Sequence, residues 1–480
     1  MSSQRIFNSI LSAALLACLG LPGVAPADDE VGSAGGWGKF KVGSALIHIE
    51  LTGTAGERRP MDVLLFYPAD KTAHQSASPT VYVSRLKGKP IIDPNNPNRW
   101  VPMSYAVAAE GARGSVPVDQ HGPRFPLIVF SHPAMSDPQN IAPTLERLAS
   151  HGYVIAAPWH EGDTQDDRII DVINGLAKTK IIPCFDGGPS PCLDAALQKA
   201  VQNRALDIAA LIDAIPAYFG DRVDMERVGL FGQSRGVLTA LAAAGGSTPF
   251  NIQAEPRIDA IMMLAIGMRS ATVSMDLAKV AIPSLFVAGK IDRNTPMAIS
   301  VEAFDTVSSQ EKGLVIFELA EHGVYSINRC AHMQAAGAIF QAESRAIGEQ
   351  LTLENIMVSL NSGTPIDYCR FDFFVNPVDI RPVVKTMTGF DVTPANVPRQ
   401  LDAVTAMPVV LELANTFFDA TLVKHDRDEE GPRFKRYLSP EYLLKKEGAV
   451  VSYAESQTPR GRAVACDDPD LISLDPSCAD

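Results

Sequence analysis

The fold of this chain is most visible in the stretch VGLFGQSRGVLTALAAAGG, residues 228–246. An apolar run enters the pentad Gly232-Gln233-Ser234-Arg235-Gly236, and a longer apolar run leaves it. Such a pattern is typical of a strand, a sharp turn and a helix. Ser234 then has two interpretations: a helix N-cap, for which Ser is a preferred residue, or a nucleophile held on the turn. The residues further along the chain decide between them.

Strand-like and helical patterns alternate along the chain. Short apolar runs predict strands at residues 45–51, 61–67, 126–130, 153–157, 228–231, 258–265, 283–288 and 314–319. Helical spacing predicts helices at 141–151, 200–217, 237–244 and 401–422, the last with a kink or break at Pro408. The later strand runs are continuously apolar, which is typical of a parallel sheet covered on both faces. We therefore predict an α/β fold with a mainly parallel eight-stranded sheet, helices on both faces and an antiparallel first pair of strands.

Three stretches interrupt this alternation. Residues 72–124, 163–198 and 323–398 are each too long for an ordinary connection. We expect them to be insertions that decorate one domain, which spans residues 28–480. Residues 423–480 are polar and acidic, and we expect them to form a C-terminal extension.

The first 27 residues have the layout of a secretory signal peptide. Arg5 is their only charge, an apolar stretch follows, and Ala25-Pro26-Ala27 forms an A-x-A cleavage site. The apolar stretch is short for a membrane span. A lipoprotein signal at Cys18 is the less favoured alternative, because Leu16 fits that pattern poorly. We expect an exported protein, periplasmic or extracellular, with no stable membrane span in the mature chain.

Composition and cysteine content agree with an exported globular protein. The 480 residues are 46% apolar and carry a formal net charge of −13, which argues against binding to nucleic acid or anionic membranes. Six cysteines remain after the leader, and the simplest disulfides join neighbours in sequence, although fifteen pairings are possible. Those neighbours are Cys184–Cys192, Cys330–Cys369 and Cys466–Cys478. No Cys/His spacing indicates a metal site.

Two residues downstream turn Ser234 into the predicted nucleophile. A catalytic serine needs a histidine base and an acid that orients it, and in this kind of fold they follow in the order serine, acid, histidine at strand ends. Asp292 lies just past the strand run at 283–288, and His322 lies just past the run at 314–319. Other residues of the right types lack a strand end to place them, namely His332, His425, Asp259, Asp305 and Glu321. We predict the triad Ser234, His322 and Asp292.

A tetrahedral oxyanion needs two hydrogen-bond donors. One is predicted at the backbone N–H of Arg235, and the other in the loop Ser131-His132-Pro133-Ala134-Met135. Pro133 has no N–H, so Ala134 is the expected donor and Met135 the alternative. We expect the ring of His132 to hydrogen-bond to the loop rather than to carry protons. The residues expected at the substrate are His132, Met135, Trp159, His160 and Gln233.

The segments MDVLLFYPA, FPLIVFSHPAMSD, LASHGYVIAAPWHEGD, GLFGQSRG, VAGKIDRNTP and ELAEHG resemble the α/β-hydrolase superfamily. They look most like its platelet-activating-factor acetylhydrolase-like and dienelactone-hydrolase-like branch, and the resemblance implies the same triad. Two positions depart from that pattern: Pro133 replaces the usual glycine, and Arg235 resembles the Ser-Arg-Gly of chlorophyllase-like esterases. Ser234 in place of cysteine argues against a dienelactone hydrolase proper.

These patterns together predict a secreted serine hydrolase that cleaves carboxylic esters through an acyl-enzyme, with a small-molecule or lipid ester as substrate and no cofactor. Two alternatives stay open: an amidase or peptidase on the same fold, and a non-catalytic binding protein built on it. The sequence also leaves open whether the Arg235 side chain faces the substrate or anchors the helix.

Overall fold

The computed structural model describes residues 35–53, 56–83, 91–93, 96–101, 106–134, 136–164, 191–267, 272–292, 294–322, 324–325, 401, 403–423, 439–448 and 450–479. The predicted leader, Cys18, Met135 and most of the second and third insertions lie outside these residues. The side chains of the predicted disulfide pairs Cys184–Cys192 and Cys330–Cys369 also lie outside the described part of the chain.

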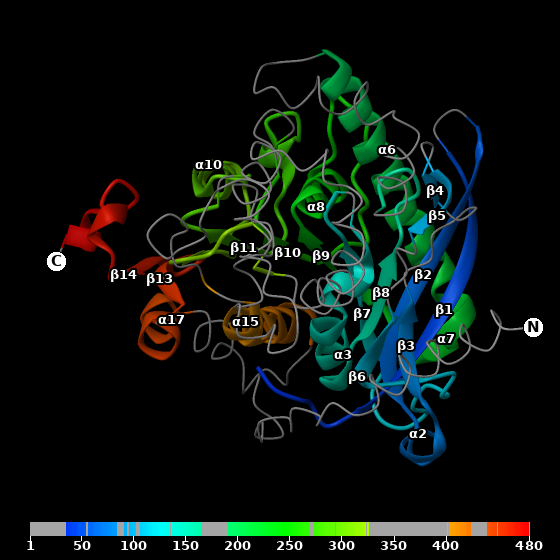
Figure 1. Cartoon of the computed structure of the whole chain (residues 1–480). Coiled ribbons are helices and arrows are strands. Elements are labelled where there is room, and N and C mark those ends of the chain that lie inside the picture. Colours follow the sequence, from blue (N-terminus) through cyan, green and yellow to red (C-terminus); the bar gives the residue numbers. More distant parts are fainter. Residues whose placement is uncertain are drawn as a thin grey trace, which may run out of the picture.

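A mixed sheet of twelve strands forms the centre of the described structure (Figure 1). Its order is β14-β13-β12-β11-β10-β9-β7-β8-β2-β1-β6-β3. The eight predicted strands are present as β1 (Lys41–Thr52), β2 (Arg58–Ala69), β7 (Phe125–Ser131), β8 (Val154–Pro158), β9 (Val223–Gln233), β10 (Ala260–Leu264), β11 (Ser284–Gly289) and β12 (Lys312–Phe317). The α/β class is confirmed, but the prediction of eight strands is wrong, because four further strands join the sheet.

Two of the further strands belong to the first insertion. β3 (Pro79–Val83) and β6 (Ala106–Gly114) extend the sheet beyond β1, and β4 (Ile91–Asp93) pairs with β5 (Asn96–Val101) in a separate two-stranded sheet. The segment therefore continues the sheet instead of decorating it. Its proline, asparagine and glycine content hid these strands, since edge strands tolerate residues that central strands exclude.

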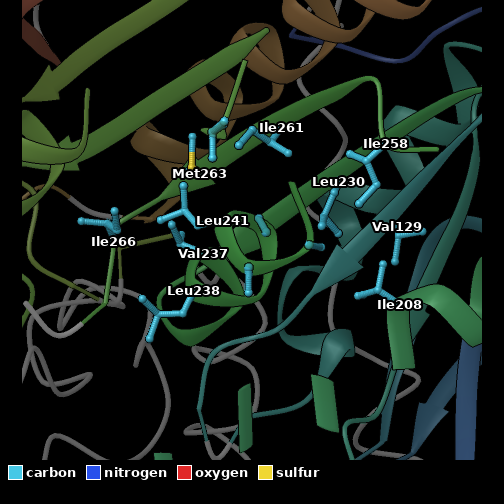
Figure 2. Close-up of a cluster of buried hydrophobic side chains, with 14 of the residues drawn as sticks. Val129, Ile208, Leu230, Val237, Leu238, Leu241, Ile258, Ile261, Met263 and Ile266 are labelled. Atoms are coloured by element: carbon cyan, nitrogen blue, oxygen red, sulfur yellow. The ribbon is translucent and has the colours of Figure 1, made fainter. Parts of the chain in front are cut away.

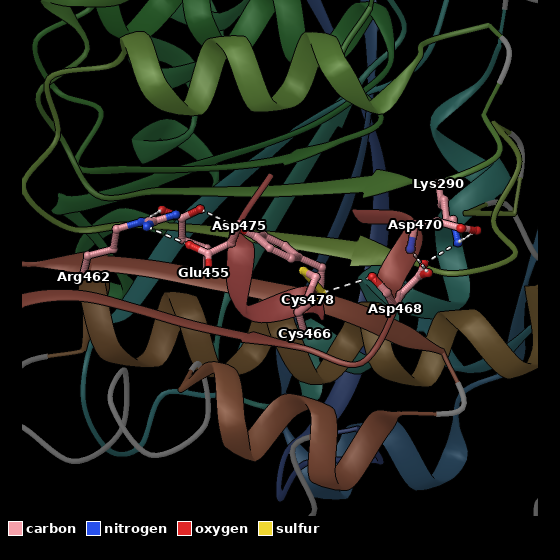
Figure 3. Close-up of a disulfide and its surroundings, with 9 residues drawn as sticks. Lys290, Glu455, Arg462, Cys466, Asp468, Asp470, Asp475 and Cys478 are labelled. Carbon is pink, nitrogen blue, oxygen red and sulfur yellow. Dashed lines mark hydrogen bonds and ion pairs between the residues drawn. A yellow bond between two sulfur atoms is a disulfide. The ribbon is translucent and has the colours of Figure 1, made fainter. Parts of the chain in front are cut away.

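The other two further strands belong to the C-terminal extension. β13 (Val451–Thr458) pairs antiparallel with β12, and β14 (Gly461–Cys466) pairs antiparallel with β13. An end strand needs only one apolar face, so the polar composition of this region masked them. The expected disulfide between Cys466 and Cys478 is present and closes the last turns of the chain (Figure 3).

The middle of the sheet is parallel and contains a reversal of strand order. β8, β7, β9, β10, β11 and β12 run parallel to one another, while β2 joins β8 antiparallel and β1 joins β2 antiparallel. The chain moves outward from β7 to β8 and then returns to β9 on the other side of β7. Ligands of open α/β sheets bind outside the carboxyl ends of strands at such a reversal.

Helices cover both faces of the parallel strands (Figure 1). α3 (Ala142–Ser150) and α15 (Ala403–Leu422) share one buried cluster with the sheet, while α6 (Pro191–Ala214), α8 (Arg235–Gly245) and α10 (Met297–Thr306) share the other. Shorter helices are α2 (Lys71–Ser76), α7 (Pro216–Phe219) and α17 (Pro440–Glu447). α15 continues across Pro408, so the predicted break does not occur there. Among the helices of the described ranges, none is long and apolar enough to cross a membrane.

The α8 face of the core fixes the helix that follows Ser234. Leu230 on β9 and Ile261 on β10 pack with Val237 and Leu241 of α8, and all four are fully buried (Figure 2). Each such side chain contributes about 1.5–3 kcal/mol by leaving water. α8 is therefore held by buried apolar side chains against the face of the central strands.

α6 departs from its prediction in detail. It begins at Pro191, earlier than expected, and ends at Ala214. Ile208 and Leu211 are buried as the helical spacing predicts, whereas Leu206 is 41% exposed. Two charged residues of this helix, Arg204 and Asp207, are instead almost completely buried, and both belong to the site described below.

Candidate active site

Ser234 lies on a strained turn between β9 and α8. Its backbone has φ 56° and ψ −115°, and α8 begins at the next residue. A non-glycine residue with such a backbone costs about 1–3 kcal/mol and is held in place only by its surroundings. A Cβ on Gly232 would lie 2.3 Å from the Gly236 carbonyl oxygen, and a Cβ on Gly236 would lie 1.9 Å from the Ser131 carbonyl oxygen. The two glycines of the pentad are therefore required by the close approach of backbone on both sides.

The turn lies at the reversal of strand order. Gly232 of β9 pairs with Ser131, the last residue of β7, so the loop after β7 lies beside Ser234. On the other side, the Ser234 N–H donates to the Leu264 carbonyl at the end of β10 (2.9 Å). Three strand ends therefore converge on one serine.

His322 and Asp292 reach Ser234 from two later strands. The Ser234 Oγ lies 2.9 Å from His322 Nε2, and His322 Nδ1 lies 2.9 Å from Asp292 Oδ2. Asp292 follows β11 and His322 follows β12, as the sequence predicts. A Cβ on Gly289 would lie 2.2 Å from the Ala320 carbonyl oxygen, so the two loops pack tightly together. The structure thus brings the three residues of the predicted triad into one hydrogen-bonded chain.

Asp292 is held by its own loop. Its Oδ1 accepts from the N–H groups of Asn294 (2.9 Å) and Thr295 (2.8 Å), and its Oδ2 accepts from the Thr295 hydroxyl (2.6 Å). The Thr295 hydroxyl also lies 3.0 Å from His322 Nδ1. Sequence reasoning missed Thr295. The spacing Asp-x-x-Thr, in which a carboxylate bonds the backbone two or three residues on, is the signal that could have found it.

The exposed fraction of the side chain rises from Asp292 to His322, and Ser234 is accessible as well. The Asp292 side chain is fully buried, 16% of the His322 side chain is exposed, and Ser234 is half-buried. A buried carboxylate that accepts from Nδ1 fixes the imidazole so that Nε2 faces the serine. The chain can therefore move a proton from the Ser234 hydroxyl to His322, while Asp292 stabilises the imidazolium that results.

The loop after β7 carries a strongly bonded carbonyl. The Pro133 oxygen accepts from His132 Nδ1 (2.7 Å) and from Arg204 Nη2 (3.2 Å), and the His132 oxygen accepts from Arg204 Nη1 (2.6 Å). In a trans peptide the C=O and the following N–H point in opposite directions. The N–H of Ala134, the expected oxyanion donor, therefore points away from Arg204.

Three of the residues that were expected to contact the substrate are buried and have almost no accessible surface. His132, His160 and Gln233 are exposed by 0%, 1% and 3% respectively. His132 bonds to the loop, as expected, and its Nε2 accepts from the His160 N–H (3.1 Å). Burial lowers the pKa of His132 and of His160 well below 6.5, with the Arg204 charge acting in the same direction, so both rings are neutral. Trp159 is half-buried against the α3 and α15 side of the core.

A second Ser-His-Asp chain lies inside the protein next to the first. Ser131 Oγ lies 2.9 Å from His160 Nε2, and His160 Nδ1 lies 2.8 Å from Asp207 Oδ2. Arg204 Nη1 also donates to Ser131 Oγ (3.3 Å). Ser131 and Asp207 are both 0% exposed, so no substrate reaches this serine. Burial raises the pKa of Asp207 to about 6 against the opposing charge of nearby Arg59.

The side chain of Arg235 points toward a buried carboxylate. Its Nη1 lies 2.6 Å from Asp163 Oδ1, while Asp163 Oδ2 accepts from Arg204 Nε (2.9 Å). Burial alone would raise the pKa of Asp163, but the two guanidiniums outweigh it and lower the pKa to about 2. The open question about Arg235 thus has a structural answer: its side chain is anchored to Asp163. Sequence reasoning missed Asp163 and Arg204.

No metal centre is found among the described residues: they contain no group of three or more His, Cys, Asp and Glu side chains placed to hold an ion. An open pocket of about 410 Å³ lies between residues 272–279 and α10. None of the triad residues lines it.

No protein-family model matches this chain, and no curated protein matches it. Among solved structures, it is similar to a ferulic acid esterase from Streptomyces cinnamoneus, at 16% sequence identity and a TM-score of 0.47. The similarity covers 82% of this chain and 94% of that one.

Proposed function

We propose that this protein is a serine hydrolase that cleaves carboxylic esters, with Ser234 as nucleophile, His322 as general base and Asp292 as the orienting acid. The observation that carries the proposal is the hydrogen-bonded chain of 2.9 Å contacts that ends on a serine with φ 56° at the start of α8. A helix N-terminus favours negative charge, and the first N–H groups of a helix have no partner within it. Negative charge that develops beside Ser234 during the reaction is therefore stabilised by the N-terminus of α8.

The proposed reaction has two halves. His322 Nε2 takes the proton of the Ser234 hydroxyl as Oγ attacks the ester carbonyl carbon, and the oxyanion accepts from the N–H groups of Arg235 and Ala134. The carbonyl then re-forms, and the alcohol leaves with the proton from His322. In the second half, His322 takes a proton from water, the hydroxide attacks the acyl-enzyme, and Ser234 leaves with that proton. Asp292 accepts from the His322 Nδ1–H throughout.

The proposal includes export and a small-molecule or lipid ester as substrate. The disulfide between Cys466 and Cys478 supports an oxidising compartment, because disulfides are rare in cytosolic proteins. The leader-like first 27 residues support the same assignment. Cleavage at the predicted site would appear as a mature N-terminus at Asp28 in mass spectrometry of the protein from the host that produces it.

Turnover of short p-nitrophenyl esters tests the proposed chemistry. We expect wild-type protein to hydrolyse them and to be labelled by a fluorophosphonate at Ser234, and Ser234→Ala to lose both properties. A matched series of p-nitroanilides separates an amidase from an esterase, since the triad serves both. Full activity in Ser234→Ala, or no labelling of folded wild-type protein, would overturn the proposal and favour a binding protein on this fold.

A further inference from the structure

We propose that Arg204 is a positioning residue of the oxyanion site, and that Asp163 links it to Arg235 so that both oxyanion donors are set by one buried ionic network. The inference rests on the proposed esterase function. It concerns residues that touch neither substrate nor reacting atoms, and that act through the backbone of the loop after β7 and through the first residue of α8.

Arg204 holds the loop after β7 through three hydrogen bonds. Its guanidinium donates to the carbonyls of His132 (2.6 Å) and Pro133 (3.2 Å), and to the Ser131 hydroxyl (3.3 Å). Arg204 is 1% exposed and comes from α6, which is packed in the core. A planar guanidinium with five donors fixes several acceptors in one geometry, which an ammonium cannot do. The peptide that carries the Ala134 N–H is therefore oriented from inside the protein.

The departure at Pro133 fits this arrangement. Proline removes one N–H from the loop, and its carbonyl accepts two hydrogen bonds, from His132 Nδ1 and from Arg204. Because the loop has one N–H fewer to offer an oxyanion, its remaining donor must be well placed. Removing one donor of an oxyanion site typically costs about 10²–10³-fold in kcat, so a tilt of this peptide is expected to be measurable.

Asp163 connects Arg204 to Arg235, whose N–H is the other expected oxyanion donor. Its two oxygens divide between Arg204 (Oδ2, 2.9 Å) and Arg235 (Oδ1, 2.6 Å). Arg235 begins α8, and its N–H is the second expected donor. Asp163 is 5% exposed, so water competes little for these contacts. A buried carboxylate thus joins the loop after β7 to the helix that follows the nucleophile.

The chain offers a matched control at the opposite edge of the sheet. Arg222 is also a buried arginine (9% exposed) that donates to loop carbonyls, at residues 119 and 121–123. It lies immediately before the first residue of β9, whereas Ser234 follows the last. A change at Arg222 reports on the general cost of losing a buried guanidinium, without reaching the proposed oxyanion donors.

The experiment compares Arg204→Lys with Arg222→Lys in the full chain. Lysine keeps the charge opposite Asp163 but cannot hold both carbonyls. We expect Arg204→Lys to lower kcat for a p-nitrophenyl ester about 10²-fold, with KM within about threefold. The inhibition constant of an aliphatic trifluoromethyl ketone, whose hemiketal oxyanion uses the same donors, should rise in proportion to the loss in kcat/KM. Arg222→Lys should keep kcat within about twofold.

The outcomes separate this inference from the proposed function. If wild-type protein hydrolyses esters and Ser234→Ala does not, the function stands and the Arg204 variant alone decides. Folded Arg204→Lys with kcat within threefold of wild type, or an equal loss in Arg222→Lys, overturns the inference. Should Arg204→Lys fail to fold, Asp163→Asn decides in its place. That variant must lower kcat at least tenfold at unchanged KM, and a smaller loss overturns the inference.

Discussion

The protein contains two Ser-His-Asp chains with nearly the same distances and opposite surroundings. In the chain of Ser234 the contacts are 2.9 Å and 2.9 Å, and in the chain of Ser131 they are 2.9 Å and 2.8 Å. Ser234 is half-buried on a strained turn before a helix, whereas Ser131 is completely buried and ends an ordinary strand. Distances alone therefore do not identify a catalytic serine.

What differs is the freedom of the serine oxygen and the position of its backbone. Ser131 Oγ is occupied on both sides, since it bonds His160 and accepts from Arg204. Ser234 Oγ bonds His322 from a backbone with positive φ, where a strained conformation persists because glycines on both sides allow it. Ser131, His160 and Asp207 lie beside the loop after β7, next to the accessible Ser234, and we propose that they support this loop.

Replacing each serine by alanine should give the largest contrast. We expect Ser234→Ala to lower kcat/KM for a p-nitrophenyl ester at least about 10⁴-fold with little change in stability. Ser131→Ala should keep kcat/KM within about tenfold and lose about 1–3 kcal/mol of unfolding free energy, because it leaves a buried His160 nitrogen without its partner. Steady-state kinetics and urea denaturation measure both effects. Equal kinetic losses in the two variants would remove the distinction drawn between the chains.

Gly236 is the point where the two chains touch, and alanine there should be the next largest effect. Its Cβ would lie 1.9 Å from the carbonyl oxygen of Ser131, so either the helix or the strand end must move. We expect Gly236→Ala to cost about 3 kcal/mol or more and to lower kcat with it.

Gly114→Ala serves as the control for that substitution. A Cβ at position 114 meets only the Thr80 hydroxyl, at 3.8 Å, which is an ordinary contact. The loss of unfolding free energy in Gly114→Ala should therefore be under about 1 kcal/mol. Thermal and urea denaturation compare the two. Similar losses would show that the close approach at Gly236 is relieved without cost.

The comparison also shows what the sequence could predict. The pentad around Ser234, and the positions of Asp292 and His322 after strand-like runs, were sufficient to place three residues that meet in the structure. The strands in the first insertion and the C-terminal extension were missed, because end strands lack the continuous apolar pattern of the centre. His132 and His160 were expected at the substrate but are buried, because strand-end position does not reveal which way a ring turns.

The buried network did leave a signal in α6. Val201, Ile208 and Leu211 of α6 are buried, and two charged residues, Arg204 and Asp207, are almost completely buried among them. A charged residue in the middle of an apolar helix face is almost always paired inside the protein. The partner, Asp163, could not be named from the sequence, since nothing in the spacing relates a loop after β8 to this helix.

Asp163 connects Arg204, which bonds Ser131, to Arg235, which follows Ser234. Its titration should therefore change the free energy of unfolding with pH. Its folded pKa, about 2, lies below the ordinary 3.8, so the ionised form is favoured by folding. The stabilisation is complete above pH 4 and is lost as the pH falls through 2. Relative to Asp163→Asn, wild-type protein should lose about 2 kcal/mol of unfolding free energy over that range.

Urea denaturation between pH 2 and pH 7 measures this loss. Asp213→Asn is the control, since Asp213 lies on the same helix as Arg204 but its side chain is 68% exposed. Its unfolding free energy should follow that of wild type at every pH. Parallel curves for wild type and Asp163→Asn would mean that the bridge between the guanidiniums adds nothing to stability.

The smallest effect is expected where the C-terminal extension contacts the loop that carries Asp292. Lys290 lies two residues before Asp292, contacts Glu318 (3.0 Å) and bonds Asp468 beside the disulfide, with 16% of its side chain exposed (Figure 3). Lys290→Ala should therefore lose about 1 kcal/mol and lower kcat less than threefold. Lys279→Ala removes a 66% exposed lysine from its pair with Asp276 and should lose under about 0.5 kcal/mol. Equal losses would show that the extension does not support the Asp292 loop.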